Sequence, residues 1–177
     1  MKALENKEIY ALEDVSLYCY EGEKCVGLNE NIFLAGPTPR SEDVKSWRPQ
    51  AINILRELGY KGNILIPEPR NGGWAENYYH QVEWELESLN KSTGIIFWIP
   101  RNMDNMPGMT TNIELGYIVG SKYSCESPDW IPYLEVGFPE NAPHTRYISA
   151  LLKYHSLGEP SNTLEATCQN MLKQLHY

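Results

Sequence analysis

The stretch TTNIELGYIVGSK, at residues 110–122, contains the side chain best suited to nucleophilic chemistry. Glu114 is a single carboxylate among apolar residues, and it follows a buried-strand pattern at 94–100 (GIIFWIP) and a loop rich in Gly, Pro and Met. We expect Glu114 at the start of a helix, where the helix dipole stabilises an ionised carboxylate. Ligands of open α/β sheets bind beyond the carboxyl ends of the strands. The alternative is that Glu114 only completes a capping box with Thr110 or Thr111.

The segments that must position Glu114 alternate between short apolar runs and amphipathic stretches. This alternation predicts an α/β fold, in which a parallel sheet of four to five strands carries helices on both faces. The lack of polar alternation at 94–100 suits a central strand that is buried on both sides. Further strands are expected at 32–35, 63–69 and 133–138, and helices at 41–58, 77–90, around Glu114, at 145–153 and at 162–175.

The loop after the first strand, Gly36-Pro37-Thr38-Pro39-Arg40, is typical of the opening of a βαβ unit. Gly36 allows the backbone to approach a ligand closely, and the two prolines stiffen the turn. Ser41 is the expected N-cap of the following helix, and Gly59 is expected to end it.

The chain divides into an extension and one domain. Residues 1–30 form the extension, in which the loosely alternating stretch 10–20 predicts a hairpin or an edge strand. Residues 31–177 form the domain, whose length suits a single hydrophobic core.

The composition argues against several function classes. A formal net charge of −8 would repel a nucleic-acid polymer or an anionic membrane. The four cysteines form no CxxC pair and have no accompanying His cluster, so we expect no zinc site. The first residues lack the apolar core of a signal peptide, and no apolar run approaches the roughly 20 residues that span a bilayer. We therefore expect a cytoplasmic protein with reduced thiols.

The order of several motifs resembles that of the nucleoside 2-deoxyribosyltransferases. The motifs run from IFLAGP through Trp47-Arg48 and WELESL to GIIFWIP and NIELGY. The similarity extends from about residue 31 to residue 154, and the pair GIIFWIP and TNIELGY is its most specific part. The resemblance implies a flavodoxin-like catalytic domain at 31–177.

The resemblance also implies that Glu114 is the nucleophile. In that family a Glu at this position attacks the anomeric carbon of a 2′-deoxyribonucleoside and expels the base, and a second base then takes the sugar. A carboxylate suits this chemistry because it stabilises an oxocarbenium-like transition state and can trap it covalently. The implied reaction needs no metal or organic cofactor. The implied partners are a small nucleoside or nucleotide, a free nucleobase and further copies of the chain in a homo-oligomer.

A second acid is needed because charge builds on the leaving base. The family usually offers an Asp on the helix before the central strand, and the nearest match here is Glu85, which is one methylene longer. Glu83 and Glu87 compete with it for this role. The simpler interpretation of Glu85 is a solvated carboxylate on the helix surface.

Five candidates for substrate binding come from the first loop and the helix after it. Gly36, Pro37 and Thr38 are expected to line the sugar–base pocket. Arg40 and Arg48 can bind a phosphate or a base carbonyl, or can form surface ion pairs.

Three further candidates have equally simple structural interpretations. Trp47 fits the apolar stripe of its helix as well as a ligand stack. Tyr79, beside Tyr78, can close over the base or remain an exposed helix aromatic. Asn112 can contact a sugar hydroxyl, but we prefer it as the cap of the Glu114 helix.

Two rival functions stay open. An N-glycoside hydrolase of a nucleotide or of NAD would use the same Glu with water as acceptor, and phosphate-binding Arg or Ser side chains near Gly36 and Asn112 would favour it. Met103, Met106 and Met109 are expected to form an adaptable wall, which departs from what the resemblance implies for a simple deoxynucleoside pocket. The rival from another class is a non-catalytic nucleotide-binding module, since fold does not imply function. An ion-paired, buried Glu114 with no pocket above the sheet would support that module. A flavin protein is less favoured, because the first loop lacks a phosphate-cradling, Ser/Thr-rich composition.

Overall fold

The computed structural model contains a five-stranded, all-parallel sheet with the strand order β1-β3-β2-β4-β5. The described residues are 8–13, 30–41, 43–70, 74, 76–123 and 131–177. The strands are β1 (Glu8–Tyr10), β2 (Asn31–Ala35), β3 (Asn63–Ile66), β4 (Gly94–Trp98) and β5 (Tyr133–Gly137). This confirms the predicted α/β class and agrees with a flavodoxin-like fold. The order reverses between β2 and β4, which is where ligands of such sheets bind.

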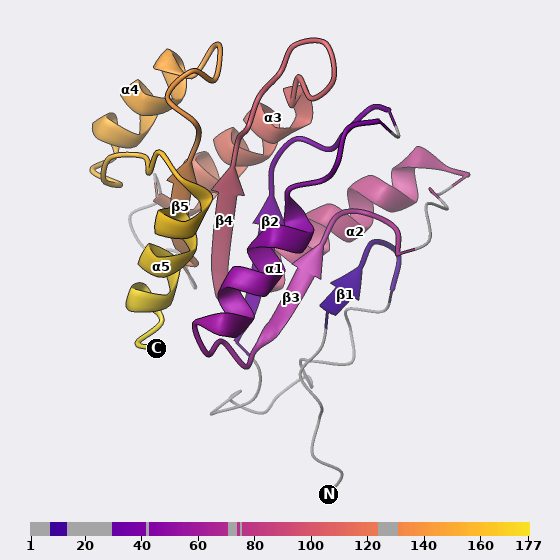
Figure 1. The fold of residues 1–177 in the computed structure, drawn as a ribbon, viewed down its shortest axis with the longest axis horizontal. Helices are drawn as coiled ribbons and strands as arrows, with labels where there is room; N and C mark the ends of the chain where they lie inside the picture. The colour runs from indigo at the N-terminus through magenta and orange to yellow at the C-terminus, as the bar shows by residue number, and fades with distance from the viewer. Residues whose placement is uncertain (1–7, 14–29, 42, 71–73, 75, 124–130) are drawn as a thin grey trace, which may run out of the picture.

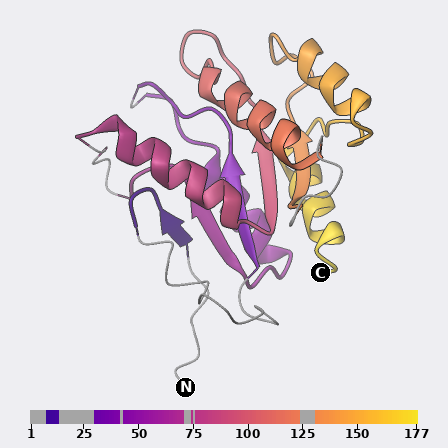
Figure 2. The same cartoon turned by 180° about the vertical axis from the view of Figure 1, so that it is seen from behind.

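Helices cover both faces of the sheet (Figures 1 and 2). One face carries α1 (Arg48–Glu57) and α5 (Leu164–Gln174). The other carries α2 (Tyr78–Lys91), α3 (Met109–Ile118) and α4 (Arg146–Tyr154). α3 continues into a π-helical segment, Val119–Tyr123.

The side chains of the central strands alternate between two cores. Phe33 pairs in register with Leu65 on one side and Ile95 on the other, and all three belong to the core under α2, α3 and α4. Their neighbours Ile32 and Leu34 belong to the core under α1 and α5. Burial on both faces explains why these strands are continuous apolar runs in the sequence.

The N-terminal strand lies at the edge of the sheet. Glu8–Tyr10 pairs parallel with β3, and the Ala11 backbone N–H donates to the Glu68 carbonyl at 3.1 Å. The expected edge strand is thus present, although it begins before the stretch 10–20. The hairpin alternative falls largely on residues 14–29, which lie outside the described part of the chain.

The helix after β2 begins later than expected. Its N-cap is Trp47, so the prediction of Ser41 as the N-cap is wrong. Pro49 explains the start, because proline lacks a backbone N–H and fits only the first turn. The predicted end is confirmed: Gly59 has φ +93°, and the Tyr60 N–H donates to the Leu55 carbonyl at 2.9 Å, as in a Schellman motif.

Within the described part of the chain, no helix combines the length and apolar character needed to cross a membrane.

Candidate active site

A cavity of about 140 Å³ opens at the carboxyl ends of β2, β3 and β4. It lies at the strand-order reversal, and its walls come from the loops after these strands and from three helices. The lining residues are Gly36, Pro37, Thr38, Arg40, Arg48, Pro67, Glu85, Pro107, Gly108, Met109, Thr110 and Glu114. Seven of the ten sequence-predicted site residues therefore meet here. The other three, Trp47, Tyr79 and Asn112, do not line the cavity.

Glu114 reaches the cavity from the second turn of α3. The helix begins at Met109 with Gly108 as its N-cap, so the expected position of Glu114 at the helix start is wrong. The capping box with Thr110 or Thr111 is not formed either. Because the helix dipole acts mainly within the first turn, it contributes little to the ionisation of Glu114.

Gly108 brings this helix close to the first loop. Its φ of +62° lies in the left-handed region that favours glycine. A Cβ placed on Gly108 would lie 3.0 Å from Cβ of Pro37, so the two loops touch at this point. The glycine therefore determines how α3 enters the site.

Burial and then the charge of Glu85 raise the pKa of Glu114 from 4.5 to about 7, against a smaller opposing effect of Arg48. The Glu114 side chain is half-buried, and among the described residues it forms no ion pair. A carboxylate that lies in a cavity, has no ion-pair partner and has a pKa of about 7 is better suited to a catalytic role than to a structural one.

Glu85 reaches the cavity from α2, whose N-cap Asn77 accepts a hydrogen bond from the Tyr79 backbone. Burial raises its pKa, while the amide of Gln81 and the charge of Arg48 lower it. The competing carboxylates lie elsewhere. Glu83 is exposed, and Glu87 pairs with Lys91 at 2.5 Å. Glu85 is thus the carboxylate of α2 that faces Glu114.

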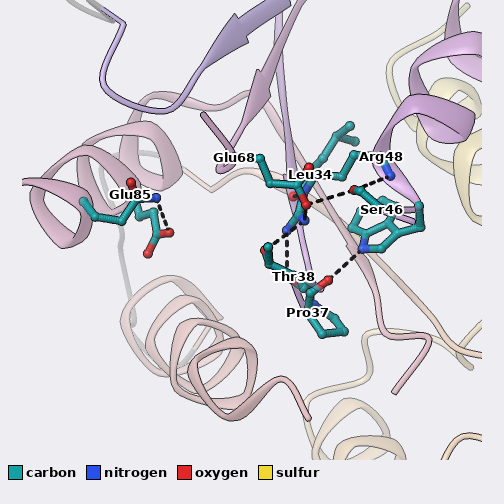
Figure 3. A network of polar contacts seen from close by, with 10 residues as sticks. Leu34, Pro37, Thr38, Ser46, Arg48, Glu68 and Glu85 are labelled. Atoms are coloured by element: carbon teal, nitrogen blue, oxygen red, sulfur yellow. Dashed lines mark hydrogen bonds and ion pairs between the residues drawn. The ribbon is translucent and has the colours of Figure 1, made fainter. Parts of the chain in front are cut away.

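Arg48 is a fully buried cation among the residues that line the cavity, and Figure 3 shows the polar network around it. Its Nε donates to the Leu34 carbonyl at 3.0 Å and its Nη2 to the Gly36 carbonyl at 2.7 Å. Its Nη1 donates to Thr38 Oγ1 at 3.1 Å and to Glu68 Oε1 at 2.5 Å. Since these hydrogen bonds occupy most of its donors, Arg48 fixes the first loop. Its positive charge also lowers the pKa of Glu85 and of Glu114. Of the alternatives for Arg48, the ion pair is present, but its guanidinium is buried and does not lie at the surface.

Trp47 and Gly36 form the base of the same loop. The Trp47 ring is buried beside the Arg48 guanidinium, and its Nε1 donates to the Pro37 carbonyl at 3.1 Å. A Cβ on Gly36 would lie 2.1 Å from the Trp98 carbonyl and 2.8 Å from the Trp47 ring. Gly36 is therefore required by the protein's own packing, and Trp47 supports the loop without reaching the cavity.

Arg40 lies at the rim of the cavity. Its side chain is exposed and forms no ion pair among the described residues. Its backbone N–H donates to the Asn105 carbonyl at 3.0 Å, which ties the loop after β2 to the loop after β4. Of the three methionines expected to form a wall, only Met109 lines the cavity.

Asn112 and Tyr79 lie away from the cavity. Asn112 is not the helix cap; its Oδ1 accepts a hydrogen bond from Nη2 of the buried Arg101 at 2.5 Å. Arg101 also donates to the His144 carbonyl at 3.0 Å and so fixes the first turns of α3 against the loop before α4. Tyr79 is 65% exposed at the start of α2.

Sequence reasoning missed two residues that hold the charged groups of the site. Glu68 accepts hydrogen bonds from both Arg48 and Ser46, the latter at 2.9 Å. Its position near the carboxyl end of the strand expected at 63–69 was an available signal. Gln81 donates to Glu85 Oε1 at 2.8 Å, and the spacing of four residues on one helix was the signal there.

Two acids in one cavity, with a buried cation beneath them, can cleave a bond in which one carboxylate attacks and the other supplies a proton. Residues 29–125, just over half of the chain, match the family model described as nucleoside 2-deoxyribosyltransferase like. A comparison with curated proteins finds no match.

Proposed function

The chain belongs to the nucleoside 2-deoxyribosyltransferase-like family, and from this premise we propose that it transfers 2-deoxyribose between nucleobases. The observation that carries the proposal is that Glu114 and Glu85 reach one cavity from two different helices. Glu114 is the proposed nucleophile, and Glu85 is the proposed acid and base.

In the first step a Glu114 oxygen bonds to C1′ of the deoxynucleoside while the C1′–N bond breaks. The electron pair of that bond goes to the base, which takes the proton of Glu85. In the second step the nitrogen of another base attacks C1′, the ester to Glu114 breaks, and Glu85 recovers a proton from the incoming base. The chain therefore returns to its starting state after one exchange.

The charges of the site support a pair of carboxyls that exchange protons near neutral pH. Burial and then the neighbouring charge raise the pKa of Glu114 to about 7, so a substantial fraction of Glu114 is ionised near neutral pH. Burial raises the pKa of Glu85, against the opposing effects of Gln81 and Arg48, and this is the direction that a general acid needs. The charge of Glu85 also opposes the ionisation of Glu114 in the same cavity.

The size of the cavity supports a particular orientation of the substrate. At about 140 Å³ it is smaller than the roughly 300–1,000 Å³ pockets that enclose drug-sized ligands. The sugar then lies inside between the two glutamates, and the base lies toward the mouth near Arg40 and Met109.

A second candidate is an N-glycoside hydrolase that acts on a nucleotide. Arg40 favours it, because an exposed cation on the cavity rim without an ion pair among the described residues can bind a phosphate. The N-terminus of α3, which has no side-chain cap, borders the same cavity and also favours an anion. The non-catalytic module is less favoured, because Glu114 has no ion pair in the described chain and lines a cavity above the sheet.

A chromatographic assay tests the proposal. The protein is incubated with thymidine and adenine, and separately with deoxynucleoside monophosphates, ribonucleoside monophosphates or NAD without an acceptor base. Deoxyadenosine formed by the wild type and by Glu83→Gln, but not by Glu114→Gln, supports the transferase. Base or nicotinamide released only without an acceptor moves the protein to the hydrolases. Activity that survives Glu114→Gln contradicts both.

A further inference from the structure

Gln81 is the hydrogen-bonding partner of Glu85 on its own helix. Its Nε2 donates to Glu85 Oε1 at 2.8 Å, one turn along α2 (Figure 3 shows this bond at Glu85). The inference drawn here rests on the proposed function, in which Glu85 exchanges a proton with the base.

The environment of Gln81 is unfavourable for an amide. Its side chain is 3% exposed, and its Oε1 is buried without a hydrogen-bonding partner among the described residues. A buried acceptor without a partner lowers the stability of the folded state. An apolar side chain of similar length would fill the same space without this cost, so folding does not explain a glutamine here.

Among the residues that the structure describes, no ion pair and no other hydrogen bond fixes the direction of the Glu85 carboxyl. The charged groups around it are Glu114 from α3, Arg48 from α1 and Arg40 from the first loop. Arg48 is committed to Glu68 and to carbonyls of the first loop, and Glu114 has the same charge sign as Glu85. The amide of Gln81 is thus the group that hydrogen-bonds to the Glu85 carboxyl within the described chain.

We propose that Gln81 is a positioning residue, which holds the Glu85 carboxyl toward the cavity so that it can exchange a proton with the nucleobase. The bond from Gln81 leaves one carboxyl oxygen of Glu85 for the substrate. Because Gln81 donates a hydrogen bond, it also favours the ionised carboxylate, which Glu85 must form after it protonates the leaving base. A general acid that is 1 Å out of place can lose about a hundredfold in rate.

The test compares Gln81→Met and Gln81→Leu with Gln169→Met. Gln169 is a matched control, because it donates to Glu165 four residues away at 3.4 Å, on α5 at the opposite face of the sheet. Three quantities are measured for each variant: the midpoint of urea unfolding, kcat and KM for base release, and the ¹³C NMR titration midpoint of the Glu85 carboxyl. The Glu85 signal is assigned by its loss in Glu85→Gln.

For the Gln81 variants we expect an unfolding midpoint, measured at pH 4 so that ionisation of Glu85 contributes little, at or above that of the wild type. We expect a kcat lowered about tenfold, with KM changed less than about twofold. The Glu85 titration should move to higher pH, while Gln169→Met should leave all three quantities unchanged. A loss of stability at pH 4 in both Gln81 variants, or an unchanged kcat and Glu85 midpoint, would overturn the proposal. If the wild type releases no base, the proposed function fails, and the NMR midpoint still decides whether Gln81 controls Glu85.

Discussion

Glu114 on α3 and Glu85 on α2 line the same cavity, so the proton affinity of each depends on the charge of the other. Burial and then the charge of Glu85 raise the pKa of Glu114 to about 7. Because Glu85→Gln removes the like charge, we expect it to lower the pKa of Glu114. ¹³C NMR titration of the Glu114 carboxyl measures this. Glu83→Gln, which changes an exposed carboxylate on the same helix, should have little effect.

The same pKa makes Glu114 costly for folding at alkaline pH. Its folded pKa of about 7 exceeds the 4.5 of a free glutamate, so the ionised form is disfavoured in the folded state. The cost is absent below pH 4.5, grows as pH rises to 7 and is then constant at up to about 3 kcal/mol. We expect Glu114→Gln to raise the free energy of unfolding at pH 8 by up to that amount, and not at pH 4.

Urea unfolding at the two pH values tests this sign. The exposed Glu165 provides the control substitution, Glu165→Gln, for which we expect no comparable gain. A gain of equal size at pH 4 and pH 8 would show that packing, and not ionisation, explains the effect of Glu114→Gln.

Breaking the buried ion pair Arg48–Glu68 should lower the free energy of unfolding far more than breaking a half-exposed ion pair of the same type. Arg48 is 1% exposed, so Glu68→Gln leaves a buried cation without its counter-ion and should destabilise the fold by about 3–5 kcal/mol. Glu8→Gln breaks the half-exposed pair with Arg56, which is 2.7 Å long, and should cost less than about 1 kcal/mol. Similar unfolding midpoints for the two variants would contradict the central role given to Arg48.

Substitutions at two glycines with positive φ can distinguish the effect of backbone strain from the effect of displacing α3. Gly108→Ala and Gly59→Ala should each cost about 1–2 kcal/mol, because both positions have positive φ. Only Gly108 faces a neighbour, Pro37, whereas a Cβ on Gly59 meets nothing within 4 Å. Gly108→Ala should therefore also lower kcat/KM for base release about tenfold, since Gly108 and Pro37 both line the cavity. Gly59→Ala should keep the wild-type kcat/KM at a temperature where it is folded.

Much of this architecture could be predicted, because local patterns carry it. The continuous apolar runs at 32–35 and 94–100 are the strands β2 and β4, which are buried on both faces. Once these strands are parallel neighbours, the loops at their carboxyl ends must meet. That is why Thr38 and Glu114, which are far apart in the sequence, line one cavity.

The errors concern features that depend on contacts between elements. Serine is favoured at helix N-caps, which is why Ser41 was expected there, but Pro49 and the packing of Trp47 determine where α1 begins. The sequence around Arg48 does not distinguish an arginine that binds a ligand from one that binds other groups of the protein. Only the folded chain brings the carbonyls of Leu34 and Gly36 to its guanidinium.

The strand β1 has a consequence for any attempt to trim the protein to its family-matching part, which begins at residue 29. The pairs Glu8–Ile64 to Tyr10–Ile66 occupy the outer backbone groups of β3, which reads Asn-Ile-Leu-Ile and is fully buried. Without β1, this apolar strand would expose unpaired N–H and C=O groups, which invite strands from other molecules. A shortened chain should therefore aggregate, even though its cavity residues are all present.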